Sequence, residues 1–166
     1  MNLFILSENQ EECVKLMMDK HIIKIILEAA QMLSTNKRIL DPENLHEYND
    51  IVYKQTHMNH PVTKWVRESF QNWCWTIKLC EEMHREWQYR YNHHKQHKSF
   101  IIIEYLRDNP PPLSNFIKNE FTKFALAMPD EYKTTSPVES YRNYYNSPDK
   151  KKIASWKNRP VPEWFI

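Results

Sequence analysis

Glycine is absent from this 166-residue sequence, whereas it makes up about 7% of an average protein. Phosphate-binding loops of the Walker and dinucleotide types need glycine, because only glycine lets the backbone approach a phosphate so closely. The sequence therefore excludes both of these nucleotide-binding classes. Tight hairpin turns also favour glycine. Turns and helix ends must depend on Asn, Asp, Ser and the ten prolines, and this favours a helical fold.

Cysteine pairs and long apolar runs are lacking as well. The three cysteines, Cys13, Cys74 and Cys80, are odd in number and have no paired spacing, which favours a reducing compartment. The beginning of the sequence has no charged region ahead of a long apolar one, and no stretch is long enough to cross a bilayer. We expect a cytoplasmic protein with no membrane segment. The bias toward Asn, Lys, Ile and Tyr fits an A+T-rich, viral genome, in which case the compartment is the host cell cytoplasm.

The length is sufficient for one domain with a substantial apolar core. We expect an all-α, compact single domain in which two long helices pack together and prolines bound several short helices. The predicted division is a helical core over residues 1–132 and a basic, aromatic segment over residues 133–166 that packs on it. Because the apolar stripe of the second long helix can be satisfied within one chain, we expect a monomer.

Periodicity, capping residues and prolines predict the positions of the helices. Residues 1–6 are apolar and are expected to be extended against the core. A capping box at residues 7–10 predicts a helix that reaches about Ser34. Aromatic and apolar residues at alternating spacings of four and three predict a second long helix from Pro61 to Tyr91. Shorter helices are expected over residues 42–53, 99–107, 113–126, 138–145 and 151–156.

The first predicted helix carries a narrow polar stripe on an otherwise apolar circumference. Its members are Lys20, His21, Lys24, Glu28, Gln31 and Thr35. In one interpretation the stripe is the solvated face of a packed helix, and Lys24 and Glu28 form an ordinary pair. In the other it is the wall of a cleft, where apolar neighbours perturb the pKa values of an imidazole, two amines and a carboxylate. The second interpretation predicts acid and base chemistry.

Cationic residues concentrate near the C-terminus, although the formal net charge is only +2. From residue 133 onward there are seven cationic and three anionic residues, an excess of four, with aromatic residues between them. Local basicity together with stacking groups indicates nucleic-acid binding. The residues expected to hold the backbone and to stack on bases are Arg142, Tyr144, Tyr145, Lys150, Lys151 and Lys152.

A histidine-rich segment, residues 92–98, follows the second long helix. His93 and His97 are four residues apart and could share a metal ion on one helical turn. No cysteine pair, HExxH motif or suitably spaced carboxylate accompanies them, and basic side chains are already favourable at a helix C-terminus. The sequence therefore predicts no metal site, and it predicts no cofactor.

The first helix resembles that of the phage-type pyrimidine-dimer DNA glycosylase/AP-lyase family, which consists of small all-helical base-excision enzymes. In that family a histidine is followed, seven residues later on the same helix, by a catalytic glutamate. His21 and Glu28 have this spacing, close behind a short N-terminal segment. Three further segments are similar to parts of the family: Asn59-His60, Met128–Tyr132 and Tyr141–Tyr145.

The resemblance implies an enzyme of double-stranded DNA that extrudes a nucleotide from the duplex. An amine then attacks the sugar C1′ and forms an imine, and a carboxylate accepts the proton that allows strand scission. Glu28 would be the acid and base, and His21 would orient it or bind phosphate. The family uses the α-amine exposed by removal of the initiator methionine, but Asn2 normally leaves that methionine in place. The candidate amines are therefore Met1, Lys24 and Lys20.

Departures from the family leave other functions open. The arginines that flank the family's glutamate correspond to Leu27 and Gln31. A glycosylase with an altered substrate, or one without lyase chemistry, therefore fits the sequence as well as a true pyrimidine-dimer enzyme does. One alternative class is a nucleotide- or nucleoside-processing enzyme that uses the same His/Glu pair. Another is a non-catalytic viral protein that binds a host factor. Further nucleic-acid contacts are expected from Lys20, Gln31 and His60.

Overall fold

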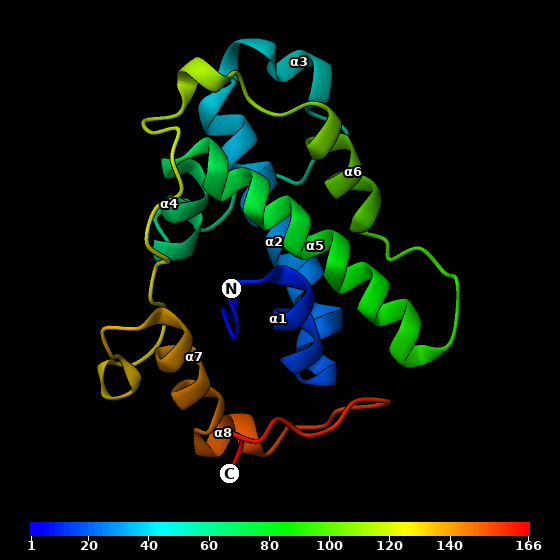
Figure 1. Ribbon diagram of the computed structural model, residues 1–166. Coiled ribbons are helices and arrows are strands. Elements are labelled where there is room, and N and C mark those ends of the chain that lie inside the picture. Colours follow the sequence, from blue (N-terminus) through cyan, green and yellow to red (C-terminus); the bar gives the residue numbers. More distant parts are fainter.

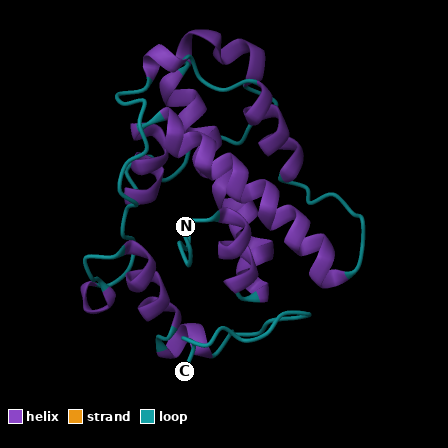
Figure 2. Ribbon diagram, viewed as in Figure 1, coloured by secondary structure: helices purple, strands orange, loops and turns teal.

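The computed structural model describes all 166 residues and consists of helices and loops without a β-sheet (Figures 1 and 2). Two helices of 22 residues, α2 (Asp19–Leu40) and α5 (Phe70–Tyr91), pack against each other. Helices α4 (Pro61–Glu68) and α6 (Phe100–Asp108) pack on both of them, and α1 (Gln10–Leu16) packs on α5. The prediction of an all-α fold with two long packed helices is confirmed.

The remaining helical elements are short. They are the 3₁₀ turns Pro42–Asn44, Leu113–Asn115 and Asp130–Tyr132 and the helices α3 (Leu45–Tyr48), α7 (Pro137–Tyr145) and α8 (Pro148–Lys151). Proline lies in the first turn of α4, α7 and α8. It is tolerated there because N–H groups of the first turn have no acceptor within the helix. Helices α6 and α7 confirm two of the short predicted helices. No helix is both long and apolar enough to span a bilayer.

The first predicted helix is in fact two helices. The backbone is extended at Met17 and Met18, with ψ angles of 142° and 153°, and α2 begins only at Asp19. The Asp19 amide donates to the carbonyl oxygen of Ser155 in the C-terminal segment at 2.8 Å. In a continuous helix this amide would donate to a carbonyl of the preceding turn, whereas here it donates to a distant part of the chain. Helix α2 then continues to Leu40, six residues beyond the predicted end.

Two N-caps decide where α1 and α5 begin. The side chain of Asn9 accepts the Glu12 amide and caps α1, so the capping box predicted at residues 7–10 is wrong. Ser69 has an extended backbone and its hydroxyl accepts the Gln71 amide. Because Ser69 caps a new helix, the predicted helix from Pro61 to Tyr91 is divided into α4 and α5.

Two predicted helices near the C-terminus are wrong. Residues 113–126 contain only a 3₁₀ turn, and the segment after it crosses α4 and α5. The backbone of Thr122 is bonded by side chains of those helices: its amide donates to Asn72, and its carbonyl accepts from Trp65. Tertiary hydrogen bonds have replaced the helical ones. The helix expected over residues 151–156 is absent, because α8 ends at Lys151, the first residue of that range.

The N-terminal segment is enclosed between the helical bundle and α7–α8 (Figure 1). Residues 3–6 are buried and not helical, as their apolar character predicts. From the other side, Arg142 of α7 donates two hydrogen bonds, of 3.0 and 2.8 Å, to the carbonyl oxygen of Leu6. Asn2 donates its side-chain amide to the carbonyl of Ala127 at 2.8 Å. Both ends of the chain therefore meet over α2.

A buried ion network fastens the last residues to the bundle. Arg90 of α5 is fully buried and donates to Asp19 at 2.9 Å and to Glu86 at 2.7 Å. Glu86 also pairs with Arg159 at 2.8 Å, and Asp19 accepts the Lys157 amide. Burial alone would raise the pKa of Asp19, but the hydrogen bonds from Lys157 and Arg90 outweigh it and lower the pKa. Both carboxylates are consequently kept charged.

Candidate active site

The N-terminal segment brings the α-amine of Met1 beside a carboxylate of α2. The amine nitrogen lies 3.6 Å from Oε2 of Glu28, and the same oxygen accepts the backbone amide of Asn2 at 2.7 Å. The other oxygen, Oε1, lies 3.5 Å from Nζ of Lys24, one helical turn earlier. A buried carboxylate thus holds two amines that approach it from different segments.

The periodicity of α2 explains why its polar residues face the N-terminal segment. His21 and Glu28 are buried, and the Lys24 side chain between them is 70% exposed. The exposed Lys24 and its pair with Glu28 agree with the solvated-face interpretation of the polar stripe. The burial of His21 and Glu28 beside a pocket agrees with the cleft-wall interpretation. Two residues of the otherwise apolar circumference, Ile23 and Leu27, are exposed.

These groups surround a pocket of about 190 Å³. The pocket is bounded by α2, by the first residues of the chain and by the segment from residue 127 to α8. Its lining consists of Met1, Asn2, Phe4, His21, Lys24, Ile25, Glu28, Ala127, Tyr144 and Lys150. One small space therefore contains an α-amine, two lysine amines, an imidazole and a carboxylate.

Lys150 reaches this pocket from the C-terminal segment. Its Nζ lies 4.8 Å from the ring centroid of Phe4 and 5.1 Å from that of Tyr144, within cation–π distance of both. Burial and then the charge of Lys24 lower the pKa of Lys150. The structure therefore brings Tyr144 and Lys150 to the site. Lys151 and Lys152 are exposed and lie outside the pocket.

His21 is held by two aromatic side chains. Its Nδ1 lies 2.6 Å from the hydroxyl of Tyr145, and its ring stacks on Phe4 with centroids 4.1 Å apart. Burial, followed by the charges of Lys150 and Lys24, lowers the pKa of His21 to about 3. The imidazole is neutral at physiological pH and forms no hydrogen bond with the pocket carboxylate. The ring therefore does not orient that carboxylate, which corrects the first of the two roles drawn from the resemblance. Phosphate binding by His21 stays a prediction.

Two of the predicted nucleic-acid contacts, the buried Tyr145 and the half-buried Arg142, have partners within the fold. Tyr145 is fully buried, and its hydroxyl lies against His21. Arg142 donates to the Leu6 carbonyl and packs over the ring of Trp164 at 5.3 Å. The full burial of Tyr145 corrects the expectation that it stacks on a base. The contact expected of Arg142 stays a prediction. Both side chains connect the C-terminal segment to the pocket.

His60 lies at the start of α4, near the α-amine of Met1. Its Nδ1 accepts the amide of Val62 at 3.2 Å and so caps the helix. Burial, and then the charge of the α-amine, lower the pKa of His60. Lys20 is exposed and Gln31 is half-buried, and neither lines the pocket. The polar stripe therefore contributes only its middle part to the site.

Sequence reasoning missed the importance of Asn2 and Phe4. The side-chain oxygen of Asn2 accepts the amide of Leu3 at 2.9 Å and the hydroxyl of Tyr141 at 3.3 Å. These bonds fix the position of the residue next to the α-amine. Phe4 forms one wall of the pocket and carries the His21 ring. The only signal for Phe4 was the apolar character of residues 3–6, which predicts burial but not a site.

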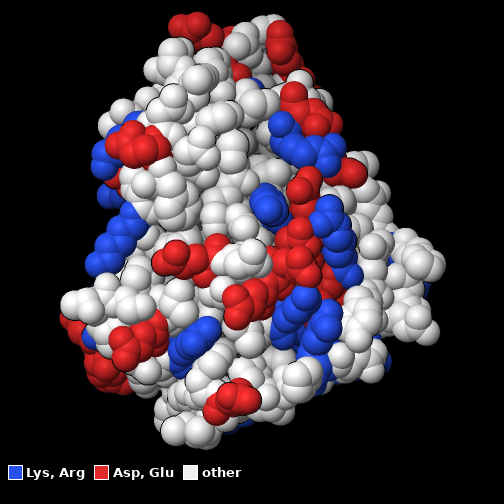
Figure 3. All heavy atoms as spheres, viewed as in Figure 1, with Lys and Arg blue, Asp and Glu red and all other residues white.

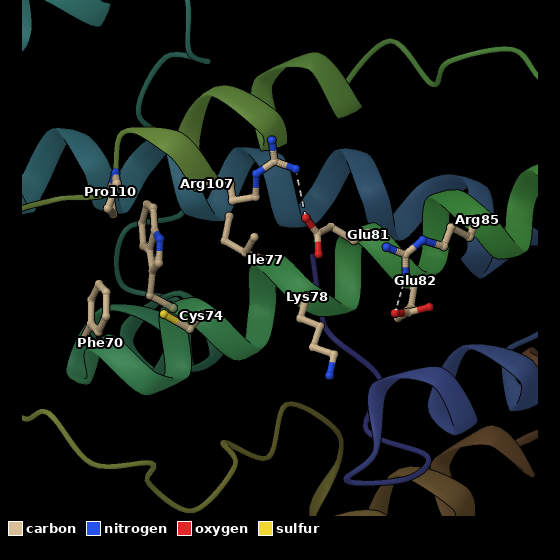
Figure 4. A pocket seen from close by; sticks show the side chains of 10 residues that line it. Phe70, Cys74, Ile77, Lys78, Glu81, Glu82, Arg85, Arg107 and Pro110 are labelled. Atoms are coloured by element: carbon tan, nitrogen blue, oxygen red, sulfur yellow. Dashed lines mark hydrogen bonds and ion pairs between the residues drawn. The ribbon is translucent and has the colours of Figure 1, made fainter.

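A second pocket, of about 370 Å³, lies along α5 and α6 and shares no lining residue with the first (Figure 4). Four of its five charged side chains are already paired, Arg107 with Glu81 at 3.1 Å and Arg85 with Glu82 at 2.6 Å, and the fifth, Lys78, has no ion pair. Burial raises the pKa of the Cys74 thiol, which therefore stays protonated. Acidic and basic side chains alternate on this face of the molecule (Figure 3). The pocket has no activated nucleophile.

An amine beside a buried carboxylate supplies the two groups that imine chemistry at a sugar carbon requires, and in this all-α chain the two lie in one pocket. A family model described as pyrimidine dimer DNA glycosylase matches residues 1–99, more than half of the sequence. The chain belongs to the pyrimidine dimer DNA glycosylase family. Comparisons with curated proteins and with solved structures gave no match.

Proposed function

We propose that this chain excises a base from double-stranded DNA, with the α-amine of Met1 as the nucleophile and Glu28 as the acid and base. The observation that carries the proposal is the distance of 3.6 Å between the amine nitrogen and the buried carboxylate, inside a pocket. Membership of a DNA glycosylase family supports the same substrate class. The exposed amines of Lys20, Lys151 and Lys152 would contact phosphates around the pocket.

The chemistry begins when the carboxylate accepts a proton from the α-amine. The nitrogen lone pair forms a bond to C1′ of the deoxyribose, and the glycosidic bond breaks with its electron pair leaving on the base, which takes the proton from Glu28 and so restores the carboxylate. Opening of the sugar at its ring oxygen gives the imine. The imine acidifies the proton on C2′, and if Glu28 removes it, the bond from C3′ to its oxygen breaks and the strand is cut.

Met1 is a better candidate for the nucleophile than the two lysines of α2. Its side chain is only 4% exposed, so the amine has a fixed position, whereas the Lys24 side chain is 70% exposed and free to move. Lys20 does not line the pocket.

Reductive trapping with borohydride tests the proposal. Duplexes that carry an abasic site, a thymine dimer or a uracil would be incubated with the protein, with Glu28→Gln and with Lys24→Ala. We expect a trapped adduct with the unaltered protein and with Lys24→Ala, and mass mapping should place it on the N-terminal peptide. An adduct on a lysine would overturn the assignment of the amine. No adduct and no base release on any duplex would overturn the glycosylase proposal and favour a nucleotide enzyme or a binding protein.

A further inference from the structure

The hydrogen bond between Tyr145 and His21 has a defined direction. The hydroxyl oxygen and Nδ1 are 2.6 Å apart, so either the hydroxyl or the ring nitrogen carries the shared proton. Tyr145 is fully buried, and its hydroxyl has no other hydrogen-bond acceptor. If Nδ1 were the donor, the hydroxyl proton would be unpaired in the interior, which costs free energy. The hydroxyl therefore donates and Nδ1 accepts.

This direction determines what His21 presents to the pocket. A neutral imidazole carries one N–H, and when Nδ1 accepts, that hydrogen is on Nε2. The ring lines the pocket, and Nε2 has no partner in the protein. The Phe4 ring stacked on it restricts rotation, because the two planes differ by only 18°. A fixed N–H group is thus available in the space where the α-amine and the carboxylate meet.

We infer that Tyr145 is a positioning residue that holds His21 in the Nε2–H tautomer, and that His21 donates this hydrogen to an oxygen of the bound deoxyribose phosphate. The inference rests on the proposed function, because it supplies a donor for the sugar that the amine attacks. Negative charge develops on the ring oxygen as the sugar opens, and an N–H donor stabilises it. A neutral donor fits this pocket better than a cation, since Lys24, Lys150 and the α-amine already crowd it with positive charge.

The tautomer can be measured without any activity. Nitrogen NMR of the labelled imidazole distinguishes a protonated from an unprotonated ring nitrogen. We expect Nε2–H alone in the unaltered protein and a mixture of tautomers in Tyr145→Phe. The matched control is Tyr48→Phe, because Tyr48 is equally buried but its hydroxyl bonds to backbone carbonyls of α2 and Asp41. An Nδ1–H tautomer in the unaltered protein, or no change in Tyr145→Phe, would overturn the inference.

Two substitutions of His21 test the donor role. The terminal amide of glutamine reaches the place of Nε2, whereas that of asparagine reaches only the place of Nδ1. We expect His21→Gln to retain at least tenfold more base release than His21→Asn in single turnover. Equal loss in both would overturn the donor role. If the unaltered protein releases no base from any duplex, the proposed function fails, and the NMR result still decides the tautomer on its own.

Discussion

Asn2 donates its backbone amide to the Glu28 carboxylate at 2.7 Å across 26 residues of sequence. Glu28→Gln keeps an oxygen that can accept this hydrogen bond but removes the charge that faces the Met1 amine. We expect base release and strand cleavage to fall by about 10² to 10⁴-fold, the usual contribution of a general acid or base, with little change in melting temperature. Single-turnover assays on a lesion duplex measure the rate.

Lys24→Ala is the matched control for this substitution. It removes the other cation beside the carboxylate, but the Lys24 side chain is 70% exposed, and an ion pair that solvent screens in this way contributes only about 0–1 kcal/mol. We therefore expect no more than a severalfold change in rate. Cleavage by Glu28→Gln at the rate of the unaltered protein would contradict the role of this carboxylate.

An N-terminal extension should abolish imine formation. Adding Gly-Ser before Met1 converts the α-amine into an amide, and the buried methionine side chain, whose sulfur lies 3.8 Å from the Thr63 hydroxyl, prevents a new amine from taking its place. We expect no borohydride adduct and unchanged DNA binding. The same two residues added after Ile166, which is exposed, should leave the adduct intact. An adduct that persists on the extended protein would show that a lysine is the nucleophile.

The buried His21 should make folding stability depend on pH. In the unfolded chain the imidazole takes up a proton below about pH 6.5, whereas in the folded protein its pKa is about 3. The unfolded state binds more protons between these values, so the free energy of unfolding falls as the pH decreases through this range. At about pH 4.5 the loss from this group is about 2.7 kcal/mol, at 1.36 kcal/mol per pH unit.

Urea unfolding at neutral pH and at about pH 4.5 checks this dependence. His21→Gln has no titrating group at this position. On the same acidification, its free energy of unfolding should therefore fall by about 2.7 kcal/mol less than that of the unaltered protein. The other buried histidines and carboxylates are common to both proteins and cancel in the comparison. An identical loss in both would show that the folded His21 takes up a proton as readily as the unfolded one.

Arg90→Met should strongly destabilise the protein. The substitution leaves the buried carboxylates of Asp19 and Glu86 without their guanidinium, and removal of one partner from a buried pair costs about 3–5 kcal/mol. Urea unfolding measures the loss, and limited proteolysis should show earlier cleavage after residue 152. The control is Arg85→Met, whose pair with Glu82 is exposed and should cost at most about 1 kcal/mol. Equal effects would contradict the anchoring role of Arg90.

The exposed lysines of α8 should contribute to the salt dependence of DNA binding. Each phosphate contact steepens the dependence of log K on log salt, adding about 0.9 to the magnitude of its slope for duplex DNA. The double substitution of Lys151 and Lys152 by alanine should therefore reduce the slope by about 2, as measured by fluorescence anisotropy at several salt concentrations. A double substitution of Lys64 and Lys78, also exposed but outside the pocket, should leave the slope unchanged. An unaltered slope in the first variant would exclude α8 from the DNA interface.

The helices were predictable where one apolar face decides the structure. The periodic apolar residues of α2 and α5 predict both long helices, because each buries that face against the other. The interruptions at Met17 and Ser69 were not predictable, because neither position disfavours a helix. At the first of them, α2 begins with an amide bonded to Ser155, far along the chain. The extended path around Thr122 has the same cause, since side chains of two helices take its backbone groups.

The candidate site was predictable on α2 and much less so elsewhere. A separation of seven residues places His21 and Glu28 on one face of any helix, so the sequence identified them together. Tyr145 was expected to contact DNA because it lies in a basic, aromatic segment, yet its side chain in α7 is fully buried. Likewise, nothing in the local sequence distinguishes Lys150 from the two lysines that follow it. Only the packing of α8 places it against Phe4.

The pocket joins residues from the two ends of the chain, Met1 and Phe4 from the first and Tyr144 and Lys150 from the last helices. Contacts between such distant residues close the largest loops in a chain and form late in folding. During synthesis the amine and the carboxylate are made early, but the other wall of the pocket does not exist until α8 has been made and has docked. On the proposed function, reactivity toward DNA would begin only when folding is complete, because an immature chain has only an unassembled pocket.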